Sequence, residues 1–303
     1  MQSDGNDERS SSFDGESRAS VAIVGAGAIG ATLGDALSKR ARLFLCRRTS
    51  APISVSLSGR EHQLRGTVWA GAEEAQPVDW VVVATKAQDT ETIGPWLERL
   101  VTPRTRIVMA QNGIDHASRV APWVPASRVT PTVVYTAAER MGENQVTIHD
   151  YGSLALPETT AARQFAALFS DLVDITIGTD FESASWRKLI MNSAISSVTA
   201  LTSRTVSVRD VPMIGGLLRE ILLEGITVAR ATGVPISLGE SNAMFARLAQ
   251  IPPAHRTSLE VDVSRGRPSE FQFLTGALLD HARQSGMAAP RLETVHALLS
   301  GRQ

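Results

Sequence analysis

The first part of the chain alternates short, unbroken apolar runs with segments whose apolar residues recur at helical spacing. Residues 21–24 are all apolar, as in a parallel strand buried on both faces. A glycine-rich turn follows, and from Ile29 to Leu37 the apolar positions recur every three or four residues, which predicts a helix. The apolar run at residues 43–46 comes next. Together these segments predict a strand–helix–strand unit that opens a parallel sheet.

Further strands are expected up to about residue 178. Apolar or β-branched runs that predict buried strands occupy residues 80–84, 107–110 and 132–135. A helix is predicted over residues 90–100, with Asp89 as its N-terminal cap. Alternating patterns predict antiparallel strands that decorate the sheet, at residues 55–58 and 62–65 on either side of Gly59, and at residues 145–149 and 152–156.

Beyond Phe181 the strand signals fade and long amphipathic patterns replace them. These patterns, which predict helices, cover residues 186–200, 213–232, 238–250 and 270–285. Gly- and Pro-containing breaks between them suit connections between packed helices. We therefore expect an α/β domain over residues 21–179 and an all-helical domain over residues 180–303. Residues 1–20, rich in Ser, Asp, Glu and Gly, are expected to form a flexible tail.

Composition narrows the class of protein. With 303 residues, 43% of them hydrophobic, the chain can bury one or two ordinary cores. A formal net charge of −1 offers no general attraction for nucleic acid or an anionic membrane, so we expect neither as a partner. Cys46 is the single cysteine and the six histidines show no ligand spacing, so we expect no metal site. No signal-peptide or membrane-spanning pattern is found, which favours the reducing cytoplasm.

A complete GxGxxG motif lies between the first predicted strand and the first predicted helix. Its glycines are Gly25, Gly27 and Gly30, with Ala28 and Ile29 between the last two. The first glycine permits a tight turn, the second lets backbone N–H groups approach a pyrophosphate, and the third allows close helix–strand packing. This context predicts a Rossmann-type dinucleotide-binding domain. A glycine-rich turn without a ligand is the alternative.

Two arginines stand where an NAD-binding unit would place an acidic residue. About 20 residues past the first glycine, Asp or Glu would accept hydrogen bonds from the adenosine ribose. The chain has Arg47 and Arg48 in this region. Because a guanidinium pairs with a 2′-phosphate through two hydrogen bonds, NADP(H) is favoured over NAD(H) as the cofactor. The alternative is that one or both arginines are ordinary surface charges.

Two more polar residues follow predicted strands of the sheet. Lys86 comes after the strand at residues 80–84, and Asn112 comes after the strand at residues 107–110. Ligands of open α/β sheets lie outside the carboxyl ends of the strands, so both side chains should point toward the cofactor crevice. The alternatives are a solvated loop lysine and, because Gly113 follows, an asparagine that only forms a turn.

The first group of candidate residues in the helical half lies on one helix face. Lys188 and Asn192 are four residues apart, and Ser196 continues their row. A lysine and an amide arranged in this way can donate hydrogen bonds to one region of a substrate. A partly desolvated lysine can also donate a proton near neutral pH. The alternative is a lysine that extends along the surface into solvent.

A second group contains Ser258, Asp262 and Glu270. Glu270 follows Ser269, so its ordinary role would be that of a first-turn acid that interacts favourably with the helix dipole. A buried carboxylate facing Lys188 is the other interpretation. Periodicity alone does not decide between the two.

These residues together resemble ketopantoate reductase (2-dehydropantoate 2-reductase), the NADPH-dependent enzyme of the pathway to pantothenate and coenzyme A. The resemblance covers about residues 21–299. Its marks are the glycine motif at residues 25–30, Thr85-Lys86-Ala87, Gln111-Asn112-Gly113, Trp186-Arg187-Lys188-Leu189 with Asn192, Thr199-Ala200-Leu201, and Ser258 with Asp262 and Glu270.

The resemblance implies a fold and a set of catalytic and cofactor-binding roles. The Rossmann-type domain would be followed by a helical domain similar to the C-terminal part of 6-phosphogluconate dehydrogenases, with the site in the cleft between them. Lys188 would be the general acid that protonates the 2-keto oxygen as hydride arrives, and Glu270 would hydrogen-bond a substrate hydroxyl. Lys86 and Asn112 would line the nicotinamide side.

On the substrate side the chain departs from the family pattern at two positions. Asn192 and Ser258 are kept, and by resemblance they would hold the substrate. Eight residues after the lysine the family usually has a second asparagine, where this chain has Ser196. Three residues before the family serine, His255 replaces another asparagine. Ser196 and His255 are therefore candidate substrate-binding positions that can change the preferred molecule.

The leading functional hypothesis is reduction of a small 2-keto acid by NADPH, with 2-dehydropantoate as the first candidate substrate. A relative that reduces another ketone or an imine in specialised metabolism is the second hypothesis. A non-enzymatic NADPH-sensing regulator is the third, and the retained Lys188, Asn192 and Glu270 argue against it. The resemblance also implies a homodimer formed through the helical half.

Overall fold

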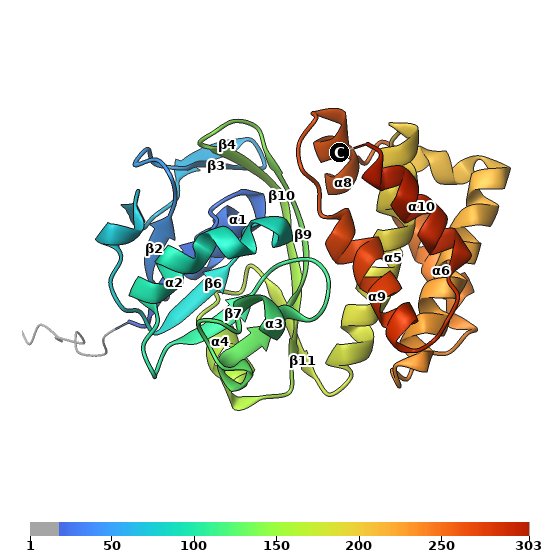
Figure 1. The fold of residues 1–303 in the computed structure, drawn as a ribbon. Helices are drawn as coiled ribbons and strands as arrows, with labels where there is room; N and C mark the ends of the chain where they lie inside the picture. Colours follow the sequence, from blue (N-terminus) through green and yellow to red (C-terminus); the bar gives the residue numbers. More distant parts are fainter. Residues whose placement is uncertain (1–17, 303) are drawn as a thin grey trace, which may run out of the picture.

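The chain folds into an α/β half followed by a helical half, and the predicted fold class is confirmed (Figure 1). The arrangement is that of a computed structural model, which describes residues 18–302. In Figure 1 the α/β half is blue to green and the helical half yellow to red. Strands β9 (Val133–Arg140) and β10 (Gln145–Pro157) lie between the first sheet and the long helix α5 (Phe181–Thr202).

A six-stranded parallel sheet in the order β5-β2-β1-β6-β7-β8 forms the centre of the α/β half. Its strands are β1 (Ser20–Val24), β2 (Arg42–Cys46), β5 (Thr67–Trp69), β6 (Trp80–Val83), β7 (Arg106–Met109) and β8 (Val129–Pro131). The apolar runs predicted as strands at residues 21–24, 43–46, 80–84 and 107–110 are therefore confirmed. They are apolar throughout because both faces of the sheet are covered.

Helices connect these strands, and one of them differs from its prediction. The connecting helices are α1 (Ala28–Leu37), α2 (Gly94–Leu100) and α3 (His116–Val120), with short 3₁₀ helices η1 (Ala72–Glu74), η2 (Ala87–Ile93) and η3 (Ala126–Arg128). The helix expected over residues 90–100 is correct only in its second half, since η2 occupies the first. α2 begins at Gly94 because Pro95 has no N–H to donate to the preceding turn. Asp89 does not cap the helix; its carbonyl accepts a hydrogen bond from the Thr92 hydroxyl.

A second sheet has the order β11-β10-β3-β4, and β9 also pairs with β10. Its shorter strands are β3 (Ser54–Leu57), β4 (Arg60–Gln63) and β11 (Asp174–Gly178). Strands β3 and β4 form the predicted antiparallel pair. Their turn places Ser58 and Gly59 at φ values of +50° and +77°, the backbone conformation that suits a tight hairpin. Helix α4 (Thr160–Ala166) packs beside β11.

Two strand predictions are corrected in this sheet. The run at residues 132–135 lies mostly in β9, which is antiparallel to β10, while β8 takes the edge of the parallel sheet. Strand β8 ends at Pro131, which has no N–H for a further ladder bond. The segments 145–149 and 152–156 form one strand, β10, with irregular pairing between Ile148 and Ser153. Gly152 is required there, because a Cβ would lie 1.8 Å from the Tyr135 carbonyl oxygen.

The second half is helical, as predicted. After α5 it contains η4 (Val206–Asp210), α6 (Pro212–Ala231), α7 (Glu240–Gln250), α8 (Ser258–Ser264), the π-helical turn η5 (Gln272–Gly276), α9 (Ala277–Gln284) and α10 (Pro290–Ser300). The predicted helices at residues 186–200, 213–232 and 238–250 correspond to α5, α6 and α7. Among residues 18–302 no helix is both long and apolar enough to cross a bilayer.

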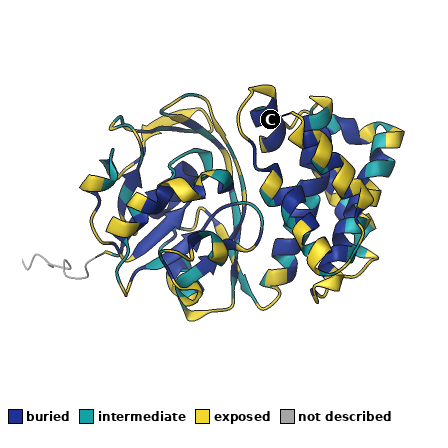
Figure 2. Cartoon of the chain, viewed as in Figure 1, coloured by how far each residue is buried: buried dark blue, intermediate teal, exposed yellow. Residues whose placement is uncertain are grey.

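The two halves have separate apolar cores. One face of the first sheet packs against α1 and the second sheet, the other face packs against α2, and the helical half has its own core around α5 and α6. Figure 2 shows these buried positions in dark blue along the sheet and on the inward sides of the helices. The domain boundary near residue 180 stays a prediction. Of the predicted tail, residues 1–17 lie outside the described range, and Ser20 already belongs to β1.

Candidate active site

The glycine-rich turn joins β1 to α1 at the carboxyl edge of the first sheet. Gly25 has φ +95°, and its carbonyl accepts the Gly27 N–H at 2.8 Å. A Cβ at Gly30 would lie 2.3 Å from the same carbonyl, whereas one at Gly27 would meet no described heavy atom within 4 Å. The backbone at Gly27 is therefore open to a ligand. With Ala28 and Ile29 opening α1, the turn fits a pyrophosphate at a helix N-terminus.

The two arginines after β2 have different surroundings. Arg47 donates to the carbonyl oxygens of Ala51 and Glu143, the latter at 3.2 Å, and to Asn144 Oδ1 at 2.5 Å. Its guanidinium is thus held against the turn between β9 and β10. Arg48 is exposed and makes no hydrogen bond or ion pair with any other residue in the range 18–302. A phosphate can reach Arg48 without displacing a protein contact.

Lys86 and Asn112 lie at neighbouring strand ends. Between them, Gln111 Nε2 donates to the Thr85 carbonyl at 3.1 Å and to the Thr90 hydroxyl at 2.9 Å. These bonds tie the segment after β6 to the segment after β7. The two segments together form the edge of the α/β half that meets the helices.

Two buried carboxylates of the helical half reach these strand ends. Glu270, just before η5, accepts the Ala87 N–H at 2.8 Å and Asn112 Nδ2 at 3.1 Å. Asp262 on α8 forms an ion pair with Lys86. The structure therefore brings Lys86, Asn112 and Glu270 together from both halves of the chain. The side-chain hydrogen bonds of Glu270 go to the α/β half, and its negative charge raises the pKa of Lys188 from a longer distance.

Lys188 lies on the side of α5 that faces β9. Its Nζ donates to the Val134 carbonyl at 2.5 Å and lies 5.3 Å from the centroid of the Tyr135 ring. Burial lowers the pKa of Lys188 from 10.5 to about 8, and the negative charge of Glu270 opposes the shift. An amine with this pKa is protonated at neutral pH and can still release its proton.

A narrow crevice beside Lys188 receives polar groups from both halves. Its wall includes Asn112 after β7, Thr132 between β8 and β9, and Lys188 and Asn192 on α5. Three predicted site residues, Asn112, Lys188 and Asn192, are thus adjacent. Because Lys188 and Asn192 are on successive turns of one helix face, an ammonium and an amide can contact the same small molecule. No group of His, Cys, Asp and Glu suited to a metal ion occurs among the described residues.

The remaining predicted substrate-binding residues do not line this crevice. Ser196, one turn beyond Asn192, is buried in α5. His255 and Ser258 are exposed, the first in the connection before α8 and the second in the first turn of α8. Partial desolvation of the His255 ring nevertheless lowers its pKa, and the charge of His149 on β10 acts in the same direction. Their part in binding stays a prediction.

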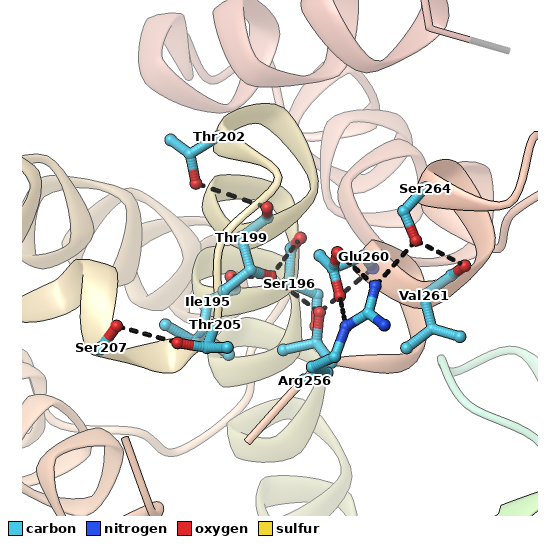
Figure 3. A network of polar contacts seen from close by, with 11 residues as sticks. Ile195, Ser196, Thr199, Thr202, Thr205, Ser207, Arg256, Glu260, Val261 and Ser264 are labelled. Atoms are coloured by element: carbon cyan, nitrogen blue, oxygen red, sulfur yellow. Dashed lines mark hydrogen bonds and ion pairs between the residues drawn. The ribbon is translucent and has the colours of Figure 1, made fainter. Parts of the chain in front are cut away.

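A polar network positions α8 against α5 (Figure 3). Thr257 caps α8 by accepting the Glu260 N–H at 3.3 Å, and its hydroxyl lies 2.7 Å from the Thr199 hydroxyl on α5. Arg256 donates twice to Glu260, at 2.6 and 2.7 Å, and once to Ser264 at 2.8 Å. The carboxylate that pairs with Lys86 therefore sits on a helix with a defined position.

Sequence reasoning does not identify three residues that the structure places at the site. Thr132 and Tyr135 belong to a run whose pattern predicts a buried strand, yet Tyr135 is 46% exposed. Their polar groups on either side of two valines are the one signal that could have drawn attention to them. Arg119 on α3 donates to the carbonyls of Asn112 and Ile114 at 2.9 and 2.8 Å. Nothing in its sequence surroundings indicates this role.

Comparison with known proteins gives matches along both halves of the chain. Residues 21–160 match the family model described as ketopantoate reductase PanE/ApbA, and residues 180–303 match the model of its C-terminal part. The 2-dehydropantoate 2-reductase of Caulobacter vibrioides is 30% identical over 286 residues, which cover 93% of this chain and 98% of that protein. The enzyme of the same name from Mycobacterium tuberculosis is 30% identical over 285 residues, covering 92% and 96%.

Solved structures agree with these matches. A dimeric ketopantoate reductase from Staphylococcus aureus superposes with a TM-score of 0.85 at 28% identity, covering 94% of this chain and 98% of that one. The similarity thus extends over the glycine-rich turn, the strand ends and α5. The chain belongs to the ketopantoate reductase family of oxidoreductases.

Proposed function

We propose that this chain is an NADPH-dependent reductase of 2-keto acids, with 2-dehydropantoate as the leading substrate and pantoate as its product. The observation that carries the proposal is the ammonium of Lys188, with a pKa of about 8, beside a crevice to which both halves contribute. Similarity to two 2-dehydropantoate 2-reductases over nearly the whole chain supports the substrate class. In this proposal an α/β domain up to residue 179 and a helical domain from residue 180 enclose the site.

The residues around the crevice suit the protein's part of such a reduction. When bound, the reduced nicotinamide supplies a hydride to the keto carbon. Lys188 holds a proton at Nζ, stabilises the negative charge that grows on the keto oxygen, and gives the proton to it. The Val134 carbonyl keeps Nζ in place. Asn192 orients the substrate through its amide, and Glu270 accepts a hydrogen bond from a substrate hydroxyl.

The cofactor would lie along the carboxyl edge of the first sheet. The turn at residues 25–30 would hold the pyrophosphate, since Gly27 leaves room for it. Lys86 and Asn112 would line the nicotinamide side. Of the two arginines we assign the 2′-phosphate to Arg48, because Arg47 is already hydrogen-bonded to the turn between β9 and β10.

A reductase of another ketone or of an imine is the second candidate. Two positions favour it, since Ser196 and His255 stand where the family pattern has asparagines, and Ser196 is buried within α5. A site that hydrogen-bonds one hydroxyl of its substrate rejects analogues without that hydroxyl. When the polar groups that make this bond are replaced, the site no longer distinguishes the substrate from such analogues.

The test is NADPH oxidation with 2-dehydropantoate, a panel of other 2-keto acids, and cyclic imines. The proposal expects rapid turnover with 2-dehydropantoate. Rapid turnover with an imine or another ketone alone would establish the second candidate. If NADPH oxidation stays at the background rate with all of these compounds although NADPH binds tightly, both reductase proposals are contradicted. The protein would then be a nucleotide sensor.

The cofactor assignment has its own test in two single variants. Removing a charge-assisted hydrogen bond costs about 1.5–3 kcal/mol, so Arg48→Ala should weaken NADPH binding roughly 10- to 100-fold and leave NADH binding unchanged. Arg47→Ala should lower the melting temperature and change the NADPH to NADH preference little. Titrations that find the preference reduced only in Arg47→Ala would reverse the assignment.

We further propose a homodimer formed through the helical half. An apolar groove between α5, α6 and α10 supports it; the groove is lined by Leu201, Ile214, Leu217 and Leu298, of which Leu298 is 55% exposed. The similar Staphylococcus aureus protein is dimeric. Light scattering should give twice the chain mass for the wild type and a monomer for Leu298→Glu. A monomeric wild type at micromolar concentration would contradict the proposal.

We propose the reducing cytoplasm as the location of the protein, because a chain with a single cysteine is built without an internal disulfide. Cys46 is the single cysteine and is buried at the end of β2. Burial raises the pKa of its thiol, so it stays protonated and unreactive. Because Cys46 is the single cysteine, no disulfide within the chain contributes to its stability.

A further inference from the structure

The Thr132 hydroxyl lies beside the crevice and is only 1% exposed. Its backbone N–H donates to the Met109 carbonyl at 3.1 Å, which holds the residue between β8 and β9. The side-chain oxygen has no hydrogen-bond partner among residues 18–302. Thr132 therefore carries a polar group that the surrounding protein does not satisfy.

Two other buried threonines of the same half are satisfied by protein. The Thr105 hydroxyl donates to the Val78 carbonyl at 2.7 Å, and the Thr90 hydroxyl donates to the Ala87 carbonyl at 2.7 Å. A buried hydroxyl without a partner costs free energy, so its presence in a well-packed region calls for an explanation. Ser193 and Ser197 also lack a described partner, but they lie within α5 and do not line the crevice.

The neighbours of Thr132 are the groups to which the proposed function assigns chemistry. Two residues further along the chain, the Val134 carbonyl oxygen accepts a hydrogen bond from Lys188 Nζ at 2.5 Å. Across the crevice, the Asn192 amide also makes no hydrogen bond with another described residue. One buried hydroxyl without a described partner, a half-buried amide that no described protein group engages and a proton donor thus surround one small space.

We propose that Thr132 is a further ligand-binding residue, whose hydroxyl donates a hydrogen bond to an acceptor oxygen of the small molecule in this crevice. The oxygen belongs either to the keto acid or to the carboxamide of the nicotinamide ring, and the chemistry of the contact is the same for both. The inference rests on the proposed function for the identity of these ligands. Its physical basis is the unsatisfied hydroxyl, an observation that does not depend on the identity of the ligand.

The test compares Thr132→Val, Thr132→Ser and the control Thr105→Val. Valine matches threonine in shape but has no hydroxyl. Thr132→Val should keep or raise the melting temperature, because the native hydroxyl has no bond to lose, whereas Thr105→Val should lower it. Calorimetric titration of Thr132→Val should show roughly five- to tenfold weaker binding of one ligand. Thr132→Ser, which restores the hydroxyl, should bind nearly as the wild type does.

The ligands titrated are NADPH alone and pantoate in the presence of NADP. Weaker NADPH binding would identify the cofactor oxygen, and weaker pantoate binding alone would identify the keto acid side. A melting temperature that falls in Thr132→Val, with unchanged affinity for every ligand that the wild type binds, would overturn the proposal. If the wild type turns over no 2-keto acid, the proposed function fails, while NADPH affinity and melting temperature still decide the role of Thr132.

Discussion

At the scale of single residues, the choice between the two basic side chains is informative. The sequence has 30 lysines and arginines, of which only three, Lys39, Lys86 and Lys188, are lysines. Two of these three lie at the cleft between the halves. Arginine stays charged in proteins and cannot exchange a proton, whereas the pKa of lysine shifts readily on burial. A chain that uses arginine almost everywhere else thus has a lysine at the position to which we assign the proton donor.

The first prediction concerns the pH dependence of Lys188. A general acid must be protonated, so kcat/KM for reduction should be constant below about pH 7 and fall as pH rises through about 8. The shift is downward from 10.5 because burial disfavours the ammonium. With lysine labelled at the ε-carbon, NMR should show three resonances, one of which titrates near pH 8. Titration of all three near the ordinary lysine pKa would contradict the assignment.

The matched variants are Lys188→Ala and Lys39→Ala. Loss of a positioned acid should reduce turnover about 10²- to 10⁴-fold, with NADPH binding nearly unchanged. Lys39 is exposed just after α1, so its replacement should affect neither turnover nor binding. Equal turnover of the wild type and Lys188→Ala, measured as NADPH oxidation, would remove Lys188 from the mechanism.

At the scale of elements, two glycines of the glycine-rich turn have different roles. Gly30 is needed for folding, and Gly27 is needed for binding the cofactor. Gly30→Ala should lower the melting temperature strongly, because its Cβ would lie 2.3 Å from a backbone oxygen. Gly27→Ala should melt near the wild-type temperature, since its Cβ meets no described atom within 4 Å. The added methyl would occupy the space proposed for the pyrophosphate, so NADPH should bind at least tenfold more weakly. A Gly27→Ala protein that binds NADPH normally would place the cofactor elsewhere.

The loop after β7 depends on α3, and this gives a prediction for Arg119. Its guanidinium donates to Gln111 Oε1 at 3.1 Å and to the carbonyls of Asn112 and Ile114, and it lies 4.9 Å from the centroid of the Phe273 ring. Arg119→Met removes these bonds but keeps much of the side-chain volume. Asn112 should then lose its orientation toward the crevice, so kcat should fall about tenfold or more.

The control for Arg119 is an arginine with comparable contacts away from the crevice. Arg128 donates to the carbonyls of Thr102 and Thr105, the first at 2.5 Å. Arg128→Met should lower the melting temperature about as much as Arg119→Met does, while its kcat should stay close to that of the wild type. If both variants lose the same fraction of kcat, Arg119 acts only through stability.

The helices and strands could be predicted from the sequence where a single local pattern of apolar residues determines the element. The strands at residues 21–24 and 107–110 are buried on both faces, so every position must be apolar and the run is visible in the sequence. The continuity of β10 was not predictable, because its bulge near Gly152 fits a particular backbone oxygen of β9. The start of α2 was missed although Pro95 marks it, since a helical pattern of apolar residues extends across the 3₁₀ helix before it.

At the scale of the whole molecule, the site depends on contacts between segments far apart in the sequence. The motifs locate Lys86, Asn112, Lys188 and Glu270, because each follows a strand or lies in a helix of recognisable pattern. Their partners could not be predicted in this way. That Glu270 accepts from the Ala87 N–H, and not from Lys188, depends on how the helical half docks on the strand ends. Periodicity within one element carries no information about docking.

The last prediction concerns the ion pair that joins the two halves. Asp262, buried on α8, pairs with Lys86, whose side chain is 41% exposed. Because solvent screens the exposed partner, the pair is worth about 1 kcal/mol, or about fivefold in an equilibrium between closed and open arrangements of the halves. Asp262→Asn should therefore increase the radius of gyration measured by X-ray scattering, and it should raise the KM for the keto acid about fivefold. The control is Asp280→Asn, which breaks an exposed pair with Arg283 within α9 and should change neither quantity. If Asp262→Asn keeps both the wild-type radius and the wild-type KM, then Glu270 and the helical contacts alone hold the halves together, and the charge on α8 serves only to neutralise Lys86.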